Sequence, residues 1–197
     1  MNRRTFLQSA IGAGLLGAQG NLSAQNPPPN IVLIYADDLG YGDLSCYGAT
    51  AHKTPRIDQL AAEGVRFTNF YAPTPYCAPS RCSLLTGRYP FRSGMVFNPA
   101  PDAGVNDVGL PAGEVTIAEA LKPKGYTSCC IGKWHLGHTA KFLPRTQGFD
   151  EYCGILYSSD MRPVQIIENE HVAAYPVNLP TLTRNYTDRA RSEEHTS

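Results

Sequence analysis

A continuous apolar run from Asn30 to Tyr35 ends abruptly in two adjacent acidic residues, Asp37 and Asp38. The run is rich in β-branched side chains and does not alternate between polar and apolar residues. This pattern is typical of a parallel strand that is covered on both faces. Such a strand requires a sheet with helices on its faces, so the run indicates an α/β fold.

Helix and strand signals alternate after this run. Thr54 and Pro55 predict a helix start, because threonine can cap a helix and proline suits the first turn. We expect this helix to end at Gly64. Two further strands are predicted over 65–71 and 126–131. Between them, we expect a short helix over 79–86, a mostly irregular segment over 88–115, and a helix opened by a capping-box pattern at 116–119. The helix that starts at Pro55 should face inward with Ile57, Leu60 and Ala61. The helix opened at 116–119 should face inward with Ile117, Ala120 and Leu121.

Polar clusters follow three of these predicted elements. In an α/β layer fold with a largely parallel sheet, ligands bind beyond the carboxyl ends of the strands. Asp37 and Asp38 directly follow a strand and provide the oxygen ligands that Ca²⁺ and Mg²⁺ prefer. The alternative for this pair is an acidic turn in water.

The segment Cys77-Ala-Pro-Ser-Arg81 places a cysteine at the start of a helix and an arginine one turn later. The amides of a helix N-terminus attract negative charge, and the arginine adds a permanent planar donor for an oxyanion. From the residues alone, this is a reactive thiolate with an anion-binding arginine, as in cysteine-dependent phosphatases. The alternative is a buried cysteine beside a surface arginine.

Lys133 and His135 follow the predicted strand over 126–131 and, being two residues apart, lie on one side of an extended segment. Alone, such a pair is more often a surface feature than a functional site. Between them, Trp134 is expected to pack in the interior rather than to bind a ligand. Cys82, next to Arg81, is also interpreted as a packing residue, since a helix turns adjacent residues about 100° apart.

Charge and cysteine content narrow the possible functions. Lys plus Arg and Asp plus Glu both number 17, so the net charge is zero. Nucleic-acid binding and polybasic membrane binding both require excess positive charge and are not expected. The six cysteines show no Cys-x-x-Cys or Cys/His spacing of a zinc site. Most are interpreted as small buried apolar residues, although disulfides are possible in an exported protein.

Residues 1–25 have the layout of a bacterial export signal. Arg3 and Arg4 precede an apolar segment rich in glycine and alanine, which is too short for a membrane span. This is the pattern of a twin-arginine signal peptide, with Ala24 as a possible cleavage point. We therefore expect export by the twin-arginine machinery to the periplasm or the medium, after folding in the cytoplasm.

Four motifs together resemble the type I, formylglycine-dependent sulfatases, in the branch of the arylsulfatases and N-acetylgalactosamine-6-sulfatases. The motifs are Pro29 to Asp43, Cys77-Ala-Pro-Ser-Arg81 with Leu84 to Arg88, Gly132-Lys-Trp-His-Leu-Gly137, and Gln147-Gly-Phe-Asp150 through Gly154 and Ser158. They occur in the family's order between about residues 29 and 190. The resemblance implies an alkaline-phosphatase-like α/β sandwich with a largely parallel central sheet, incomplete in this chain.

The resemblance also implies the chemistry. Cys77 would be oxidised to formylglycine by a formylglycine-generating enzyme, and Asp37 and Asp38 would bind Ca²⁺ together with an oxygen of the modified residue. One hydroxyl of the formylglycine hydrate would attack sulfur, and the second would allow the resulting sulfate ester to collapse and release sulfate. Arg81 and Lys133 would hold the sulfate oxygens, His135 would contact the diol or the sulfate, and Ser158 would contact the sulfate.

The resemblance further implies that part of the catalytic machinery is absent. The family's second Asp-Asn metal pair, another histidine and a further lysine find no counterpart in residues 159–197. We therefore expect 26–190 to be the N-terminal part of a catalytic domain, with weak metal binding and negligible turnover by this chain. Residues 191–197 resemble a translated sequencing adapter, and we interpret them as an assembly artefact.

Sulfate esters of glycans or aryl groups are the expected substrates. One alternative is a phosphonate or phosphate ester hydrolase of the same superfamily. The other is a non-catalytic, sulfated-glycan-binding fragment.

Overall fold

The computed structural model describes residues 28–101 and 107–193, which form two units divided after Lys53. The α-helices are α2 (Pro55–Glu63), α3 (Cys77–Thr86), α4 (Pro90–Ser93), α5 (Ile117–Leu121) and α6 (Leu182–Glu193). The strands are β1 (Cys129–Lys133), β2 (Glu151–Ile155), β3 (Ile166–Glu168) and β4 (His171–Ala174). Within the described ranges, none of the helices is long and apolar enough to cross a membrane.

The apolar run over 30–35 is irregular, so the prediction of a buried strand there is wrong for this chain. The side chains from Ile31 to Ile34 are between 55% and 85% exposed. A parallel strand is stabilised by hydrogen bonds to its neighbours and by helices packed on its faces. The sheet of the described residues consists of β1 to β4, and none of these strands pairs with the run.

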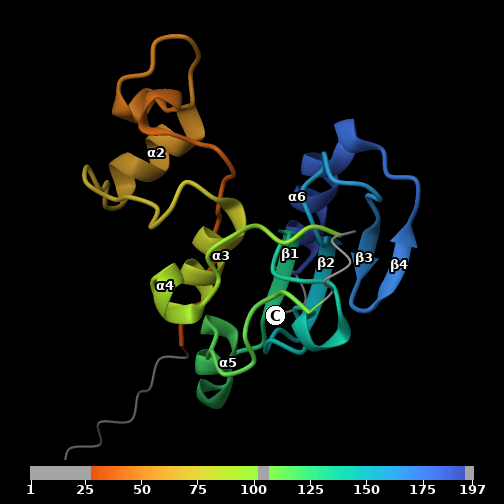
Figure 1. Ribbon diagram of the computed structural model, residues 1–197. Helices are drawn as coiled ribbons and strands as arrows, with labels where there is room; N and C mark the ends of the chain where they lie inside the picture. Colours follow the sequence, from red (N-terminus) through yellow and green to blue (C-terminus); the bar gives the residue numbers. More distant parts are fainter. Residues whose placement is uncertain (1–27, 102–106, 194–197) are drawn as a thin grey trace, which may run out of the picture. The chain divides into compact units, whose positions relative to one another are not determined.

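The second unit contains a four-stranded sheet in the order β1-β2-β3-β4 (Figure 1). Strands β1 and β2 are parallel, with Lys133 opposite Ile155, whereas β2–β3 and β3–β4 are antiparallel. The combination of this sheet with helices confirms the α/β class, although the described part of the sheet is mixed. Strand β1 begins three residues later than the predicted strand over 126–131.

Close backbone contact between the two parallel strands depends on glycine. A Cβ atom added at Gly154 would lie 1.8 Å from the carbonyl oxygen of Gly132 on β1. At the start of the pair, the Asp150 carboxylate accepts hydrogen bonds from the Ser128 amide at 2.9 Å and from Lys122 Nζ at 2.7 Å. Asp150 therefore holds the beginnings of the two strands together.

The helices begin close to where the sequence predicts them. Helix α2 starts at Pro55 and is followed by Gly64, α3 ends before Gly87, and α5 has the capping box between Thr116 and Glu119. The inward faces differ from the prediction: Leu60 of α2 is 67% exposed. In α5, Ile117 and Ala120 are exposed and Ala118 is buried instead. The reason in α5 is Thr116, whose buried hydroxyl donates to the Gln147 carbonyl at 2.8 Å and orients the turn.

The segment over 65–71, predicted as a strand, is also irregular and exposed, and its aromatic residues Phe67 and Phe70 are 62% and 68% exposed. As with the run over 30–35, no strand of the described sheet pairs with it. The segment over 88–115 is mostly irregular as predicted where it is described, except for the short helix α4.

Two apolar clusters stabilise the sheet. The first joins α3 to β1, β2 and β3 and contains Ala78, Cys82, Met95, Leu110, Trp134, Leu136, Tyr152 and Ile167. The second joins α6 to the end of β2 and to the segments flanking the β3–β4 hairpin; its buried members are Ile155, Val164 and Leu182. Helix α6 lies against β1 and β2 (Figure 1). The carboxyl end of β1 therefore lies between packed elements.

Candidate functional site

Cys77 is the first residue of α3 and is half-buried. The residue before it, Tyr76, provides no side-chain cap. Its place is taken by Asn98, whose side-chain oxygen accepts a hydrogen bond from the Ala78 amide at 2.9 Å. The Ser80 hydroxyl donates to the Thr74 carbonyl at 2.7 Å, which fixes the loop that leads into the helix. The backbone around the cysteine is therefore held by two side chains that the motif analysis did not single out for this role.

Arg81 connects α3 to the end of β1. It follows Cys77 by four residues, a spacing that places both side chains on one face of a helix. The Nη1 group of Arg81 donates to the carbonyl oxygen of Lys133 at 2.6 Å. This bond brings the cysteine motif and the Lys-x-His motif together across 52 positions of sequence.

The parallel pairing of β1 and β2 brings the ends of both strands to one edge of the sheet. Beyond the last paired residues, the Trp134 and His135 amides donate to the carbonyls of Ile155 and Leu156 at 3.0 and 2.9 Å. Ser158 lies two residues further on and is half-buried. The structure thus brings Lys133, His135 and Ser158 to the same edge.

Asp160 belongs to this group of side chains. Its pKa is lowered from the usual value, first by a hydrogen bond from the Ser158 side chain, then by a backbone hydrogen bond, with smaller contributions from Lys133 and His135. The carboxylate therefore lies within electrostatic reach of Lys133 and His135. The sequence analysis did not assign Asp160 a role; its position five residues after the end of β2, beside Ser158, was the available signal.

His135 is fully buried, and its backbone has a positive φ of 60°. Its Nε2 atom lies 3.1 Å from the Pro99 carbonyl oxygen, so this nitrogen carries a proton. The Tyr157 ring packs edge-on against the imidazole at 5.6 Å, and its hydroxyl lies 2.5 Å from Nδ1 of His138. Burial raises the pKa of Tyr157 to about 12, which keeps the phenol neutral at physiological pH.

The two expected packing residues are buried, which confirms both predictions. Cys82 is 0% exposed, and burial raises the pKa of its thiol. Trp134 is 2% exposed and donates from Nε1 to the Phe142 carbonyl at 2.8 Å. The Phe149 ring meets the indole edge-on at 6.2 Å.

Asp37 and Asp38 belong to the unit before Thr54, whereas the other candidate site residues belong to the unit after Lys53. Both aspartates are exposed, and Asp38 has a positive φ of 57°. Their carboxylates are the ligand type that Ca²⁺ prefers, but two carboxylates provide only part of its six to eight oxygens. Within residues 28–101 and 107–193, no three His, Cys, Asp or Glu side chains are grouped to hold a metal.

The expected export signal at 1–25 lies outside the described residues, as do residues 194–197 of the segment interpreted as an artefact. Helix α6 begins at Leu182 and continues through Glu193.

The sulfatase family model matches residues 29–192. Human arylsulfatase A is 52% identical over 158 residues, which cover 79% of this chain and 29% of the relative. The N-acetylgalactosamine-6-sulfatase of Rattus norvegicus is 39% identical over 195 residues, covering 88% of this chain and 36% of the relative. The chain spans about a third of the length of these curated relatives.

Two solved structures are similar as well. The PsFucS1 sulfatase from Pseudoalteromonas sp. has a TM-score of 0.73 at 28% identity, covering 100% of this chain and 45% of that chain. The structure of BT4656 in complex with its substrate D-glucosamine-2-N,6-O-disulfate has a TM-score of 0.54 at 29% identity, covering 68% of this chain and 25% of that chain. With the family match and these relatives, the chain belongs to the sulfatase family, as its motifs predict.

Proposed function

We propose that this chain is the nucleophile-bearing part of a formylglycine-dependent sulfatase that hydrolyses sulfate esters. The observation that carries the proposal is the 2.6 Å bond from Arg81 to the Lys133 carbonyl, which links the cysteine motif to the Lys-x-His motif. Membership of the sulfatase family supports it independently.

In this proposal, Arg81 and Lys133 hold the sulfate group. Arg81 contributes N–H donors from one side, and the Lys133 ammonium contributes a point charge from the end of β1. Charge grows on the leaving oxygen as the ester bond breaks, and fixed cations stabilise that state without reorganising. Asp160 lies within electrostatic reach of Lys133 and His135, and the sulfate would replace it there.

Cys77 is the position of the nucleophile. After oxidation to formylglycine by a formylglycine-generating enzyme, its hydrate would supply a hydroxyl for attack on sulfur. The half-buried position at the start of α3 presents this side chain on the same face as Arg81. Asp37 and Asp38, with an oxygen of the modified residue, would hold Ca²⁺, which supplies Lewis-acid stabilisation of negative charge when bound.

His135 and Ser158 complete the proposed substrate contacts. With Nε2 of His135 donating toward the Pro99 carbonyl, Nδ1 is the ring nitrogen that would meet the diol or the sulfate. The Ser158 hydroxyl donates to Asp160 in this structure and would turn to a sulfate oxygen.

Sulfated glycans are the substrate class that we propose. The rat relative is an N-acetylgalactosamine-6-sulfatase, and BT4656 was solved with a disulfated glucosamine. For this chain we propose export through the twin-arginine machinery and action outside the cytoplasm, on the basis of Arg3 and Arg4 and the apolar segment after them. A phosphate ester hydrolase is the less favoured alternative, because the relatives named above are sulfatases.

Mass analysis of the peptide containing Cys77 tests the proposal directly. The chain is produced with and without a formylglycine-generating enzyme. We expect the enzyme to convert the Cys77 thiol to an aldehyde and to leave Cys82, the buried cysteine five residues later, as a thiol. A Cys77 that stays a thiol in the presence of active enzyme would sink the proposal.

Turnover is tested separately. We expect negligible sulfate release by the 197-residue chain, because two carboxylates supply only part of a Ca²⁺ site. In a gene product that extends to the relatives' full length, we expect Arg81→Ala and Lys133→Ala to abolish the hydrolysis of an aryl sulfate. An aryl phosphate hydrolysed faster than the aryl sulfate would favour the phosphate ester hydrolase.

A further inference from the structure

His135 is held on one side by the segment that also caps α3. Its imidazole is fully buried, and Nε2 donates to the Pro99 carbonyl oxygen at 3.1 Å. Asn98, the neighbour of Pro99, accepts a hydrogen bond from the Ala78 amide at 2.9 Å, directly after the position of the nucleophile. The bond to Pro99 therefore sets where the imidazole lies relative to the start of α3.

The second support of the imidazole is Tyr157. A single hydrogen bond leaves a ring free to rock about the donor–acceptor line, so its orientation depends on what packs against it. The Tyr157 ring meets the His135 ring edge-on, with centroids 5.6 Å apart and an interplanar angle of 76°. Aromatic pairs favour this geometry over face-to-face stacking. Tyr157 is only 6% exposed, so its ring restricts the rotation of the imidazole.

Tyr157 is fixed in turn by His138. The phenol hydroxyl lies 2.5 Å from Nδ1 of His138, and the two rings pack with centroids 5.6 Å apart. Burial raises the pKa of Tyr157 to about 12, so the phenol keeps its proton and can donate to a neutral imidazole. An imidazolium at this position would donate to the phenol oxygen instead. The bond between the two side chains therefore forms in both protonation states of the histidine.

The turn that brings His138 back to Tyr157 depends on Gly137. This glycine has a φ of 103°, and a Cβ atom added to it would lie 2.7 Å from Cβ of Phe142. The Phe142 carbonyl accepts from Trp134 Nε1 at 2.8 Å, which closes the loop onto the end of β1. The loop therefore returns its second histidine to the tyrosine in a fixed geometry.

We propose that Tyr157 and His138 are positioning residues for His135. Tyr157 holds the imidazole so that Nε2 stays on the Pro99 carbonyl and Nδ1 remains the nitrogen for the diol or the sulfate. His138 anchors Tyr157 through the phenol hydroxyl. The inference rests on the proposed function and extends it, because it assigns roles to two residues that were not among the predicted site residues.

Hydrogen exchange of the His135 ring N–H in the 197-residue chain tests the inference. The exchange of the Nε2 proton with water is followed by NMR on protein labelled with nitrogen-15. The indole N–H of Trp134, the preceding residue, is the internal reference because it is bonded to the Phe142 carbonyl. We expect Tyr157→Leu to accelerate exchange at His135 by roughly tenfold and at Trp134 by less than about twofold. Equal acceleration at both rings would overturn the inference, since it would indicate a general loss of stability.

Variants of the hydroxyl pair test the anchoring by His138. Tyr157→Phe keeps the ring and removes the donor, whereas His138→Leu removes the acceptor. We expect each to accelerate exchange at His135 by roughly fivefold, and the double variant by no more than either single one, because all three lack the same bond. His138→Gln, whose amide oxygen can accept from the phenol, should retain slow exchange. A Tyr157→Phe variant that exchanges as slowly as the unmodified chain would overturn the anchoring.

The matched control is Tyr186→Phe, which removes the hydroxyl of a partly buried tyrosine in the second apolar cluster. It should leave exchange at His135 unchanged, and an acceleration like that of Tyr157→Phe would contradict the assignment. These measurements require neither the modification of Cys77 nor a substrate. A failed exchange test therefore leaves the proposed function standing, whereas a failed conversion of Cys77 removes the proposed reaction and leaves the exchange result unaffected.

Discussion

Two apolar segments of this chain resemble each other in sequence and differ in structure. The run over 30–35 and the segment that contains β1 are both short, apolar and followed by a polar cluster. Yet Ile34 is 85% exposed in an irregular segment, whereas β1 is paired with β2 and has α6 against it. The difference teaches that an apolar run becomes a strand only where the chain supplies a pairing partner and a cover for its faces.

Removing the partner of β1 should abolish that difference. We expect Gly154→Val to cost more than about 5 kcal/mol of unfolding free energy, a loss that is exceptional for one substitution. The reason is the Cβ position 1.8 Å from the Gly132 carbonyl, which forces β2 away from β1. Urea denaturation followed by circular dichroism measures the change. The control is Gly113→Val, at a glycine whose added Cβ would meet nothing within 4 Å; similar losses in both variants would contradict the explanation.

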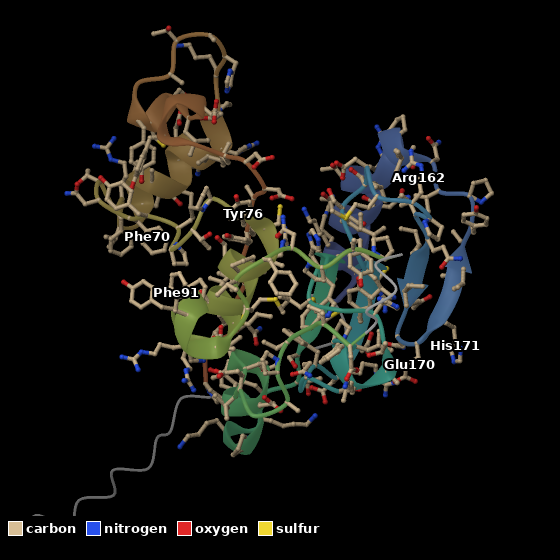
Figure 2. The ribbon with its side chains drawn as sticks, in the orientation of Figure 1. Phe70, Tyr76, Phe91, Arg162, Glu170 and His171 are labelled. Atoms are coloured by element: carbon tan, nitrogen blue, oxygen red, sulfur yellow. The ribbon has the colours of Figure 1, made fainter. Side chains whose placement is uncertain are left out.

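Removing a packed side chain at the end of β1 should have the next largest effect. We expect Trp134→Ala to lower the unfolding free energy by about 3–5 kcal/mol, because it leaves a cavity in the first apolar cluster and an unpaired Phe142 carbonyl. Phe91→Ala serves as the control, since Phe91 is 91% exposed and projects outward (Figure 2). A Trp134→Ala variant as stable as the Phe91→Ala variant would show that apolar packing around β1 stabilises the protein less than the pairing of β1 with β2.

The Asp150 carboxylate joins the starts of β1 and β2. It should contribute less to the unfolding free energy than Trp134 does, and only above acidic pH. Asp150 has a lowered pKa, chiefly because Lys122 and the Ser128 amide donate to it. Its stabilisation is therefore present above the usual aspartate pKa of about 3.9 and is lost as the pH falls through the lower folded-state value.

We accordingly expect Asp150→Asn to destabilise the protein by up to about 1 kcal/mol at pH 7. The difference in unfolding free energy between this variant and the unmodified protein should shrink toward zero in acid. Urea denaturation at several pH values measures it. The control is Glu170→Gln, which removes an exposed ion pair with Arg145. It should lower the unfolding free energy by less than about 1 kcal/mol at every pH. A gap for Asp150→Asn that stays constant down to strongly acidic pH would argue against the carboxylate as its cause.

The smallest effect is expected in the run that has no partner. Ile34→Thr should change the unfolding free energy of this chain by no more than about 0.5 kcal/mol, since exposed positions away from packed features contribute little. The same denaturation experiment measures it. A loss comparable to that of Trp134→Ala would mean that the run is buried in solution, and the contrast between the two segments would disappear.

The sequence predicted the helices better than the strands for this same reason. Helix starts depend on neighbours in sequence: the Thr116–Glu119 capping box and Pro55 in the first turn are local, and both are present. The strand over 30–35 and the buried face of α2 depend on distant partners that a propensity argument cannot supply. The β3–β4 hairpin was missed, although Asn169, with a φ of 57° between the two strands, was a local signal for a turn.

For the candidate site, the sequence identified candidate motifs but not how they are connected. Cys77, Arg81, Lys133, His135 and Ser158 follow from motifs and their resemblance to a family. The bond that joins two of those motifs uses a backbone carbonyl, and carbonyls have no signature in a sequence. The roles of Asn98 and Asp160 likewise depend on three-dimensional proximity rather than on spacing.

The acceptor in the Arg81 bond is the main-chain oxygen of residue 133 and not its side chain. That oxygen is present whatever amino acid occupies the position. Under the proposed function, descendants of this protein could therefore exchange the lysine and change how the anion is held, while Cys77 keeps its place relative to β1. The proposed site is thus divided into a side chain that can diverge and a backbone bond that stays constant, so that new ester specificities could be tried there without loss of the framework.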